Sequence, residues 1–253
     1  MIGSVQKSRS PGMLRYLNPR GRSQESEKMT PIKIATWNVE RPKLLSKRVP
    51  IINTELKKHR ADILILTETH DCISPGEGYS VCSSQPLAHE QDGSIYEQGE
   101  LRVSICSVFP IMKQLPVTNP YTTVCTLIDT PYGPLAVYGC IIGIHGRGKG
   151  FDSDLKQQVE DLSLLTKQHP VCYAGDLNLS FCDSYYTKKE SKSILEESFS
   201  KFGLKNLTAD IPATIDHIVI SKSFLSDASI RQSCWNEDKK LSDHKGVAVT
   251  IQR

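Results

Sequence analysis

Three features are missing from the sequence, and each absence excludes a class of protein. No apolar run approaches the roughly 20 residues of a membrane-spanning helix, so no membrane span is expected. The N-terminus lacks the apolar core that a secretory signal requires. None of the eight cysteines forms a Cys-x-x-Cys pair, which argues against structural zinc. Without a secretory signal, reduced thiols are favoured over disulfides. The sequence therefore predicts a cytoplasmic protein, and we expect a monomer.

A net positive charge is also absent outside the N-terminal tail. The chain of 253 residues has a formal net charge of +3, but residues 1–30 hold six of its 31 Lys and Arg residues and two of its 28 Asp and Glu residues. The remainder carries 25 basic against 26 acidic side chains, so it is nearly neutral. Strong, non-specific binding to the phosphates of a nucleic-acid duplex would normally require a basic domain. Local basic clusters nevertheless remain at Arg147/Lys149, Lys188/Lys189/Lys192 and Lys239/Lys240/Lys245.

The chain divides into a tail and one folded domain. Its composition, 38% hydrophobic and 23% charged, is that of an ordinary globular protein. Residues 1–30 have almost no periodic apolar pattern and are predicted to be a disordered tail. A mitochondrial-type presequence is the alternative, because the tail is rich in Arg and Ser, but Glu25 and Glu27 argue against it. Residues 31–253 are predicted to form the domain.

Short apolar runs predict more strands than helices in this domain. The predicted strands cover residues 32–39, 63–67, 101–108, 124–128, 134–144, 171–174, 215–220 and 247–251. The predicted helices cover residues 48–59, 152–168 and 191–202. We expect Asp152 or Ser153 to cap the second helix. Residues 70–98 are rich in Gly, Ser, Pro and Gln and are predicted to be irregular. A turn signal at residues 130–133 indicates a hairpin, which favours two packed sheets with helices outside over a purely parallel sheet.

Polar fragments stand at the ends of several predicted strands. The main ones are Trp37-Asn38, Thr67-Glu68, Gly175-Asp176-Leu177-Asn178 and Ser242-Asp243-His244. Strand ends are where a rigid scaffold delivers side chains to a shared cleft. Mg²⁺ prefers oxygen ligands and keeps several waters, so one or two carboxylates suffice to hold it. Glu68 is well placed for this, and Asn38 adds an amide oxygen.

The remaining fragments supply groups for hydrolysis. Asp176 and Asn178 lie two residues apart, so one can take a proton from water while the other positions the phosphate or nucleophile. Asp243 and His244 add a second carboxylate and an imidazole, and Asp216 could favour the charged form of that imidazole. Each fragment alone is equally well explained as a turn or a solvated strand end. Together, in this order, they predict a metal-dependent phosphoester site.

The sequence resembles the endonuclease/exonuclease/phosphatase superfamily. The resemblance covers residues 31–253 and rests on five motifs in order. They are Trp37-Asn38, Thr67-Glu68, Gly175-Asp176-Leu177-Asn178, Ile215-Asp216-His217-Ile218 and Ser242-Asp243-His244. The resemblance implies an α+β fold, a four-layer α/β/β/α sandwich of two mixed, mostly antiparallel sheets with helices outside. It also implies that this domain is catalytic.

The same resemblance implies which residues hold a metal. Glu68 would ligate Mg²⁺, for which Mn²⁺ may substitute in such enzymes, and Asn38 would lie beside it. Asp243 would help to hold a metal or its water.

The resemblance also implies the residues that act on the substrate. Asp176 would orient or deprotonate the attacking water, and Asn178 would contact the nucleophile or phosphate. Asp216 would pair with His244, which would stabilise the transition state.

A second histidine is a further candidate. Deoxyribonuclease-like members of the superfamily carry a second His on the central hairpin, paired with a Glu. Here His145 follows the predicted strand 134–144, and Glu100 opens the strand 101–108. We predict that Glu100 orients His145, which assists the leaving group. The alternative is that His145 is a loop residue beside Gly146 and Gly148.

These observations predict a Mg²⁺-dependent phosphodiesterase, an endonuclease or exonuclease acting on nucleic acid. One alternative is a phosphatase or phosphodiesterase acting on a small or lipid-derived phosphate, of the inositol-phosphate or sphingomyelinase kind. Another is an inactive binding module that has kept the fold. Retention of all the chemically useful residue types argues against that last alternative.

Overall fold

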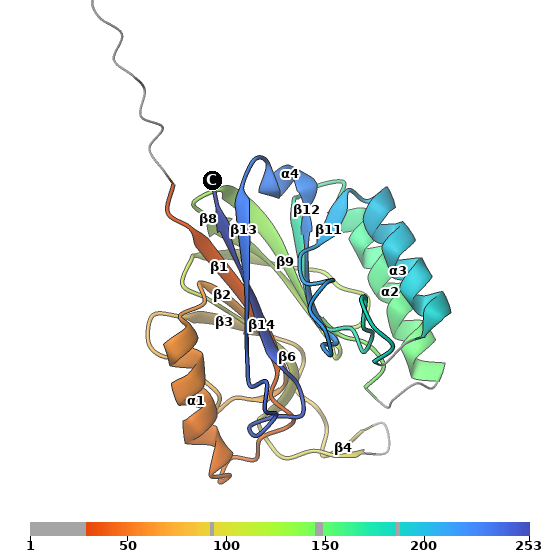
Figure 1. Ribbon diagram of the computed structural model, residues 1–253. Coiled ribbons are helices and arrows are strands. Elements are labelled where there is room, and N and C mark those ends of the chain that lie inside the picture. Colours follow the sequence, from red (N-terminus) through yellow and green to blue (C-terminus); the bar gives the residue numbers. More distant parts are fainter. Residues whose placement is uncertain (1–28, 92–93, 145–148, 186–187) are drawn as a thin grey trace, which may run out of the picture.

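A computed structural model describes residues 29–91, 94–144, 149–185 and 188–253 of the chain (Figure 1). Two six-stranded sheets pack face to face, with one helix outside the first sheet and two outside the second. This is the predicted four-layer α/β/β/α sandwich. The predicted disordered tail, except for its last two residues, lies outside the described residues. No helix in the described ranges is long and apolar enough to span a bilayer.

The first sheet joins both ends of the domain. Its strand order is β13 (Ser229–Trp235), β14 (Gly246–Gln252), β1 (Ile32–Asn38), β2 (Ile63–His70), β6 (Glu100–Ser107) and β3 (Ser80–Ser83). The β1–β2 pair is parallel and is connected by helix α1 (Arg48–His59), whereas the other neighbours are antiparallel. The predicted helix 48–59 is therefore confirmed at both ends.

The second sheet has the same number of strands and a similar plan. Its order is β11 (Leu204–Asn206), β12 (Asp216–Ser221), β10 (Val171–Asp176), β9 (Gly133–Ile141), β8 (Thr123–Thr130) and β7 (Ile111–Leu115). Again one pair, β9–β10, is parallel, and the chain between these two strands contains helix α2 (Lys149–Leu165). Helix α3 (Lys189–Lys201) lies beside α2 (Figure 1), and the short helix α4 (Lys222–Leu225) follows β12. Strands β8 and β9 form the predicted hairpin.

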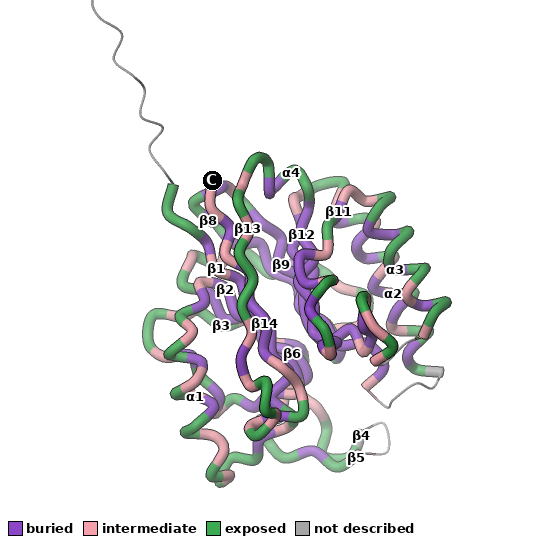
Figure 2. The backbone as a smooth tube through the Cα atoms, in the orientation of Figure 1, coloured by how far each residue is buried: buried purple, intermediate pink, exposed green. Residues whose placement is uncertain are grey.

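Alternating side chains build three cores from these layers (Figure 2). On β1, Ile32 and Ile34 face the second sheet, while Ala35 and Trp37 pack against the layer that contains α1. On β10, Cys172 and Ala174 face the first sheet, while Tyr173 packs against the layer of α2 and α3. The central strands are thus buried on both faces, which is why they appear in the sequence as nearly continuous apolar runs.

Three sequence-based expectations need correction. Residues 70–98 are not wholly irregular, because they contain β3, β4 (Glu90–Gln91) and β5 (Ser94–Ile95). Helix α2 begins at Lys149, so Asp152 lies in its first turn instead of capping it. The edge strands β7, β11 and β13 were not predicted, because edge strands expose many of their side chains and lack the apolar runs of central strands.

Strand direction brings the polar motifs together. In the first sheet, the C-terminal ends of β1 and β2 lie beside the N-terminal end of the antiparallel β14. The C-terminal end of β10 and the N-terminal end of β12 meet in the same way in the second sheet. The strand ends of the two sheets adjoin, because the backbone N–H of Asn38 donates to Asp216 Oδ1 across the sheets at 3.2 Å.

Candidate active site

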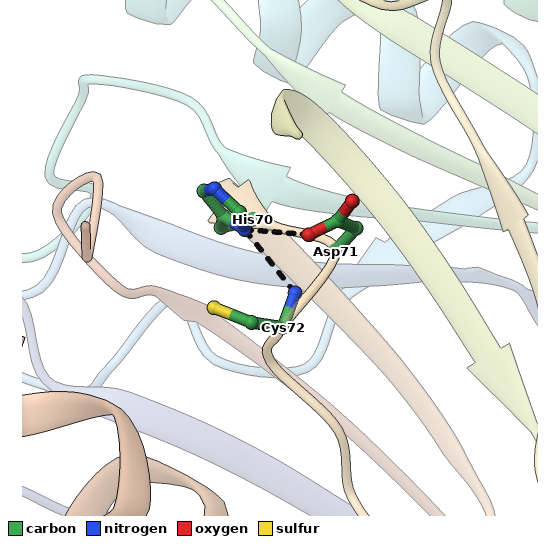
Figure 3. A group of neighbouring side chains, drawn as sticks. All are labelled: His70, Asp71 and Cys72. Atoms are coloured by element: carbon green, nitrogen blue, oxygen red, sulfur yellow. Dashed lines mark hydrogen bonds and ion pairs between the residues drawn. The ribbon is translucent and has the colours of Figure 1, made fainter. Parts of the chain in front are cut away.

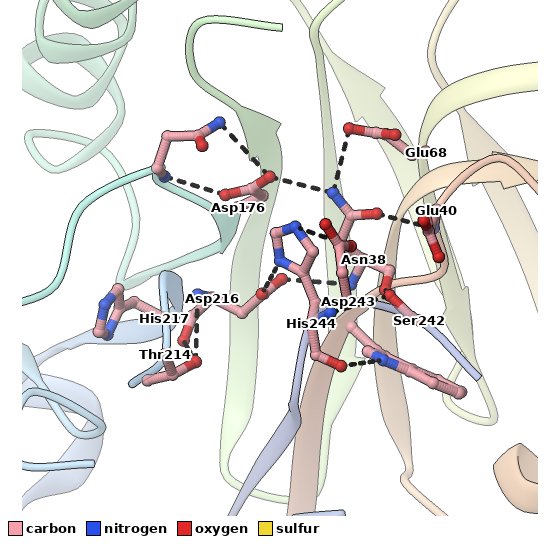
Figure 4. Close-up of polar contacts among 12 residues, drawn as sticks. Asn38, Glu40, Glu68, Asp176, Thr214, Asp216, His217, Ser242, Asp243 and His244 are labelled. Atoms are coloured by element: carbon pink, nitrogen blue, oxygen red, sulfur yellow. Dashed lines mark hydrogen bonds and ion pairs between the residues drawn. The ribbon is translucent and has the colours of Figure 1, made fainter. Parts of the chain in front are cut away.

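Asn38, at the end of β1, joins the two sheets through its side chain (Figure 4). Its Nδ2 donates to Glu68 Oε1 at 3.2 Å and to Asp176 Oδ2 at 3.0 Å. Its Oδ1 accepts the backbone N–H of Glu40 at 2.8 Å, which fixes the orientation of the amide. The fully buried Asn38 therefore holds two carboxylates from different sheets on a single donor group. Its predicted contact with a metal stays a prediction.

Glu68 adopts an unusual backbone conformation within β2. Its φ is 46°, in the left-handed region that a non-glycine residue rarely occupies inside a strand. Such strain costs roughly 1–3 kcal/mol and persists only where the surrounding structure fixes it. Here the carbonyl oxygen of Glu68 accepts the N–H of Arg41 at 2.8 Å, and the carboxylate is turned towards Asn38. The strand end is thus shaped to present this carboxylate to the cluster.

Asp176 is the last residue of β10, and Asn178 lies on the tight turn that follows. The Asn178 backbone N–H donates to Asp176 Oδ1 at 2.9 Å, and the Asn178 Nδ2 donates to the Ile142 carbonyl at 2.8 Å. Asn178 has φ 51°, a conformation that Asn tolerates better than most residues. Before it, Gly175 has φ 144°, and a Cβ there would lie 1.9 Å from the Cys140 carbonyl oxygen. The glycine of the Gly-Asp-x-Asn motif therefore permits β10 to approach β9 closely enough to deliver the aspartate.

Asp216 and His244 form the predicted pair. His244 Nδ1 lies 2.6 Å from Asp216 Oδ2, and the Asp216 side chain is fully buried. His244 Nε2 lies 3.6 Å from Oδ1 of Asp243, whose side chain is 68% exposed. The imidazole is therefore anchored on one nitrogen, while its other nitrogen lies near the partly exposed side of the cluster.

A rigid loop between β13 and β14 carries this histidine. Asn236 Nδ2 donates to the carbonyls of Ser242 and His244 at 2.8 and 2.7 Å. Ser242 Oγ donates to the Asn38 carbonyl at 2.7 Å, and Trp37 Nε1 donates to the His244 carbonyl at 3.2 Å. The Trp and Ser of the two motifs thus hold the strand ends together, a role that was not predicted from the sequence although both residues belong to the motifs. The contribution of Asn236 has no motif signal.

Burial and charge shift the pKa values in the cluster. Burial raises the pKa of Asp176 to about 7, with the negative charges of Asp216 and Glu68 adding to the effect against the opposing charge of His244. Burial also raises the pKa of Glu68. For His244, burial acts to lower the pKa, but the carboxylates of Asp216 and Asp176 outweigh it and raise the pKa to about 10. The imidazole is therefore positively charged, and it only partly neutralises the surrounding carboxylates.

The donor set fits a hard divalent cation. Its atoms are carboxylate and amide oxygens, which Mg²⁺ and Mn²⁺ prefer, and no thiol belongs to the described cluster. The raised pKa values of Glu68 and Asp176 reflect buried negative charge that one imidazolium leaves uncompensated. A cation held by Glu68, with Asp243 close to it, would neutralise that charge.

Glu100 is buried beside this cluster but is engaged by a residue that we did not predict. Its Oε2 accepts Arg41 Nε at 2.7 Å, and its Oε1 accepts the backbone N–H of Glu97 at 2.6 Å. The Arg41 guanidinium also lies 4.4 Å from the centre of the Tyr96 ring. His145, the predicted partner of Glu100, lies outside the described residues, so that pairing stays a prediction. The position of Arg41, three residues after Asn38, is the sequence signal that could have indicated it.

A separate group of potential ligands follows β2 (Figure 3). His70, Asp71 and Cys72 place one ligand atom each within 4.8 Å of one another. However, His70 Nδ1 already lies 2.7 Å from Asp71 Oδ1 and 3.2 Å from the Cys72 amide nitrogen. Burial, together with the Asp71 charge, raises the pKa of the Cys72 thiol, which disfavours the thiolate that a metal would need. These contacts explain the group as the local structure that ends β2.

The fold and the cluster together define the class of this protein, an α/β/β/α sandwich whose candidate site has the donor groups of a phosphoesterase. The chain belongs to the endonuclease/exonuclease/phosphatase family, whose sequence profile matches residues 35–244. A comparison with curated proteins finds no match.

Solved structures share the fold at low sequence identity. An endonuclease/exonuclease/phosphatase from Beutenbergia cavernae is 16% identical with a TM-score of 0.63, and the match covers 88% of this chain and 71% of that one. An AP endonuclease from Archaeoglobus fulgidus is 15% identical with a TM-score of 0.63, covering 87% and 99%. A 3′ phosphatase from Neisseria, bound to a product DNA hairpin, is 15% identical with a TM-score of 0.65, covering 87% and 99%.

Proposed function

We propose that this protein is a divalent-metal-dependent phosphodiesterase that hydrolyses nucleic acid. The observation that carries the proposal is the position of the Asn38 side chain, whose Nδ2 donates one hydrogen bond to the carboxylate of Glu68 and one to that of Asp176. The charged Asp216–His244 pair lies at the same sheet edge. Family membership supports phosphoester chemistry, and the DNA-bound neighbour supports the choice of substrate by analogy.

Glu68, with Asn38 and Asp243 near it, would hold Mg²⁺ or Mn²⁺. The bound cation would supply positive charge next to the scissile phosphate and neutralise the buried carboxylates. Both metals suit this oxygen donor set.

Asp176 is placed to orient the attacking water and to accept its proton. One of its oxygens accepts the Asn178 N–H and the other accepts Asn38 Nδ2, so the carboxylate cannot rotate freely. The Asn178 side chain, fixed to the Ile142 carbonyl, lies beside it for contact with the phosphate or the nucleophile. Holding a base and its water in one geometry removes much of the entropic barrier to attack.

His244 is placed to stabilise the charge that develops on the phosphate oxygens. Asp216 keeps the imidazole protonated and fixes its orientation through Nδ1. Its Nε2–H is then available as a charged donor at the partly exposed side of the cluster. Pre-oriented donors of this kind are worth roughly 10²–10³-fold in turnover.

A panel of substrates tests the proposal. Plasmid, single-stranded DNA, RNA, an abasic duplex, inositol phosphates and a chromogenic phosphodiester are each incubated with Mg²⁺, Mn²⁺ or a chelator. We expect metal-dependent cleavage of nucleic acid, and Asp176→Asn should lower turnover by about 10²–10⁴-fold, the usual contribution of acid–base catalysis. Lys113→Gln, on the edge strand β7, is a control that should leave turnover unchanged. Unchanged turnover in folded Asp176→Asn protein would remove this residue from the mechanism.

A phosphatase or phosphodiesterase acting on a small or lipid-derived phosphate is the second candidate. The nearly neutral charge of residues 31–253 favours this candidate, because a neutral domain offers a polyanion little electrostatic attraction. Salt distinguishes the two candidates. The affinity of a nuclease for its substrate should fall steeply with added salt, whereas the affinity for a small phosphoester should change little. The expected cytoplasmic location and monomeric state stay predictions.

A further inference from the structure

A narrow polar notch opens beside His244. Tyr185, Lys239 and Lys245 contribute its basic and hydroxyl groups, and Asp216 and His244 form part of its wall. Figure 4 shows Thr214, which also lines the notch, and Glu68 on opposite sides of His244. The notch is therefore next to the candidate active site without containing Glu68.

We propose that this notch binds a second phosphate of a nucleic-acid strand, adjacent to the phosphate that is cleaved. The proposal rests on the proposed function, because it assigns a substrate class to the same site. It identifies Lys239 and Lys245 as residues that select a polynucleotide over a small phosphoester.

Lys239 is held in place before any substrate arrives. Its Nζ donates to the Tyr185 hydroxyl at 2.9 Å and lies 4.9 Å from the centre of the Tyr185 ring. Its backbone has φ 54°, and its N–H donates to the Asn236 carbonyl at 3.0 Å. Asn236 is also the residue that holds the carbonyls of Ser242 and His244. The ammonium group and the imidazole are thus carried by one rigid loop.

Lys245 approaches from the other end of that loop. Its Nζ donates to the Pro212 carbonyl at 3.1 Å, at the start of the segment that leads into β12. Asp183 fixes this segment, because its Oδ2 accepts the Ala213 N–H at 2.7 Å while its Oδ1 accepts the Tyr185 N–H at 2.9 Å. Three loops are therefore connected around the notch by hydrogen bonds, so its two ammonium groups are positioned at little further entropic cost.

The size and chemistry of the notch select an anion. Its free volume is about 10 Å³, which is room for about one water-sized group such as a phosphate oxygen. The ammonium groups that Lys239 and Lys245 offer are donors, as phosphate oxygens require. The ammonium groups of Lys239 and Lys245 line the notch beside the carboxylates of Asp216 and Asp243. A single strand supplies a neighbouring phosphate to such a site, whereas a small phosphomonoester does not.

This local cluster also reconciles a nearly neutral domain with a polyanionic substrate. Lys239 and Lys245 belong to one of the basic clusters that the sequence contains. Two ammonium groups beside the reacting centre attract one strand locally, and they do not require a basic face over the whole protein.

The test is a binding measurement in which catalysis is blocked. In the Asp176→Asn background with Mg²⁺, the Kd of a labelled single-stranded oligonucleotide is measured by fluorescence anisotropy over a salt series. Lys239→Asn keeps a residue that tolerates a positive φ, and Lys245→Gln removes the second charge. We expect each variant to raise Kd about tenfold, as for a lost charge-assisted hydrogen bond, and to reduce the salt slope by about 0.7. Lys239→Arg should restore both values, and Lys113→Gln should change neither.

Activity measurements separate failure of this inference from failure of the proposed function. In enzyme with Asp176 intact, Lys239→Asn should lower the ratio of kcat/KM for the oligonucleotide to kcat/KM for a chromogenic phosphodiester, mainly through KM. Equal salt slopes in folded wild-type and variant proteins would overturn the phosphate subsite. Cleavage of the chromogenic diester without binding of the oligonucleotide would also overturn it, while leaving phosphoesterase activity intact. Absence of turnover on every phosphoester would overturn the proposed function itself.

Discussion

Acid is expected to destabilise this fold through His217, the residue that follows Asp216 on β12. His217 is fully buried, its Nε2 donates to the Leu179 carbonyl at 2.9 Å, and Thr208 Oγ1 lies 3.1 Å from its Nδ1. Its ring also packs edge-on against Phe181, with 4.7 Å between the ring centres. The side chain therefore ties β12 to the loop that follows Asn178.

The size of the effect follows from the pKa of this buried imidazole. Burial lowers the pKa of His217 to about 4, from 6.5 in the unfolded chain. Between these two values the unfolded state binds a proton that the folded state does not bind. The contribution of His217 to stability is thus complete above about pH 6.5, falls as the pH falls below that value, and is lost by about pH 4. The full difference corresponds to about 3 kcal/mol, of which about 2 kcal/mol is lost by pH 5.

Urea unfolding of the wild-type protein and of His217→Gln, both with chelator, provides the measurement. The buried residues Trp37 and Trp235 report unfolding by fluorescence. Gln does not ionise and retains an N–H that can donate to the Leu179 carbonyl. Between pH 7.5 and pH 5.0 we expect the wild-type free energy of unfolding to fall by about 2 kcal/mol more than that of the variant. Equal losses in the two proteins would refute the reasoning, because other titrating groups are common to both.

Three further predictions concern the cluster. In thermal scans, Mg²⁺ should raise the Tm of the wild-type protein more at pH 8 than at pH 6. The reason is that the cation must displace protons from carboxylates with raised pKa values, and fewer protons are bound at pH 8. Glu68→Gln should remove most of this rise in Tm. Gly175→Ala should lower the free energy of unfolding by more than about 3 kcal/mol or prevent folding, because the new Cβ meets a backbone carbonyl oxygen. Gly150→Ala, with open space around it in α2, should be neutral or stabilising. Urea titrations that give the two variants similar stabilities would contradict this. Asp216→Asn should lower the pKa of His244 and so move the alkaline limb of the pH–rate profile to lower pH. Turnover should fall by about 10²–10³-fold. If the alkaline limb does not move, the titration of His244 does not produce that limb.

Motif order predicted the assembly of the cluster because each motif lies at a strand end. Asn38, Glu68 and Asp176 stand where buried apolar runs stop, and Asp216 stands where the strand β12 begins. Their side chains therefore converge once the strands form two sheets. The His244 contact with Asp216 follows from the same geometry. Two packed sheets with helices outside could be predicted because apolar runs buried on both faces leave a strong signal in the sequence. The four-layer order was implied by the family resemblance.

What the sequence did not predict depends on contacts between distant side chains. The pairing of Glu100 with Arg41 brings together residues that are 59 positions apart, and neither lies in a periodic pattern. The left-handed backbone of Glu68 arises from packing at the sheet edge, since Glu has no preference for that conformation. Lys239 was visible as part of a basic cluster, but its place beside His244 depends on the loop that Asn236 organises.

The position of β1 between β2 and β14 has a consequence for biosynthesis. Trp37 and His244 touch although 207 positions separate them, so the ribosome completes most of the domain before β1 can acquire its second neighbour. Until then β1 presents an open edge to which other nascent chains can add a strand. Translation that stops before residue 244 would consequently yield a product that lacks both His244 and the strand β14, and whose exposed β1 edge is prone to aggregate.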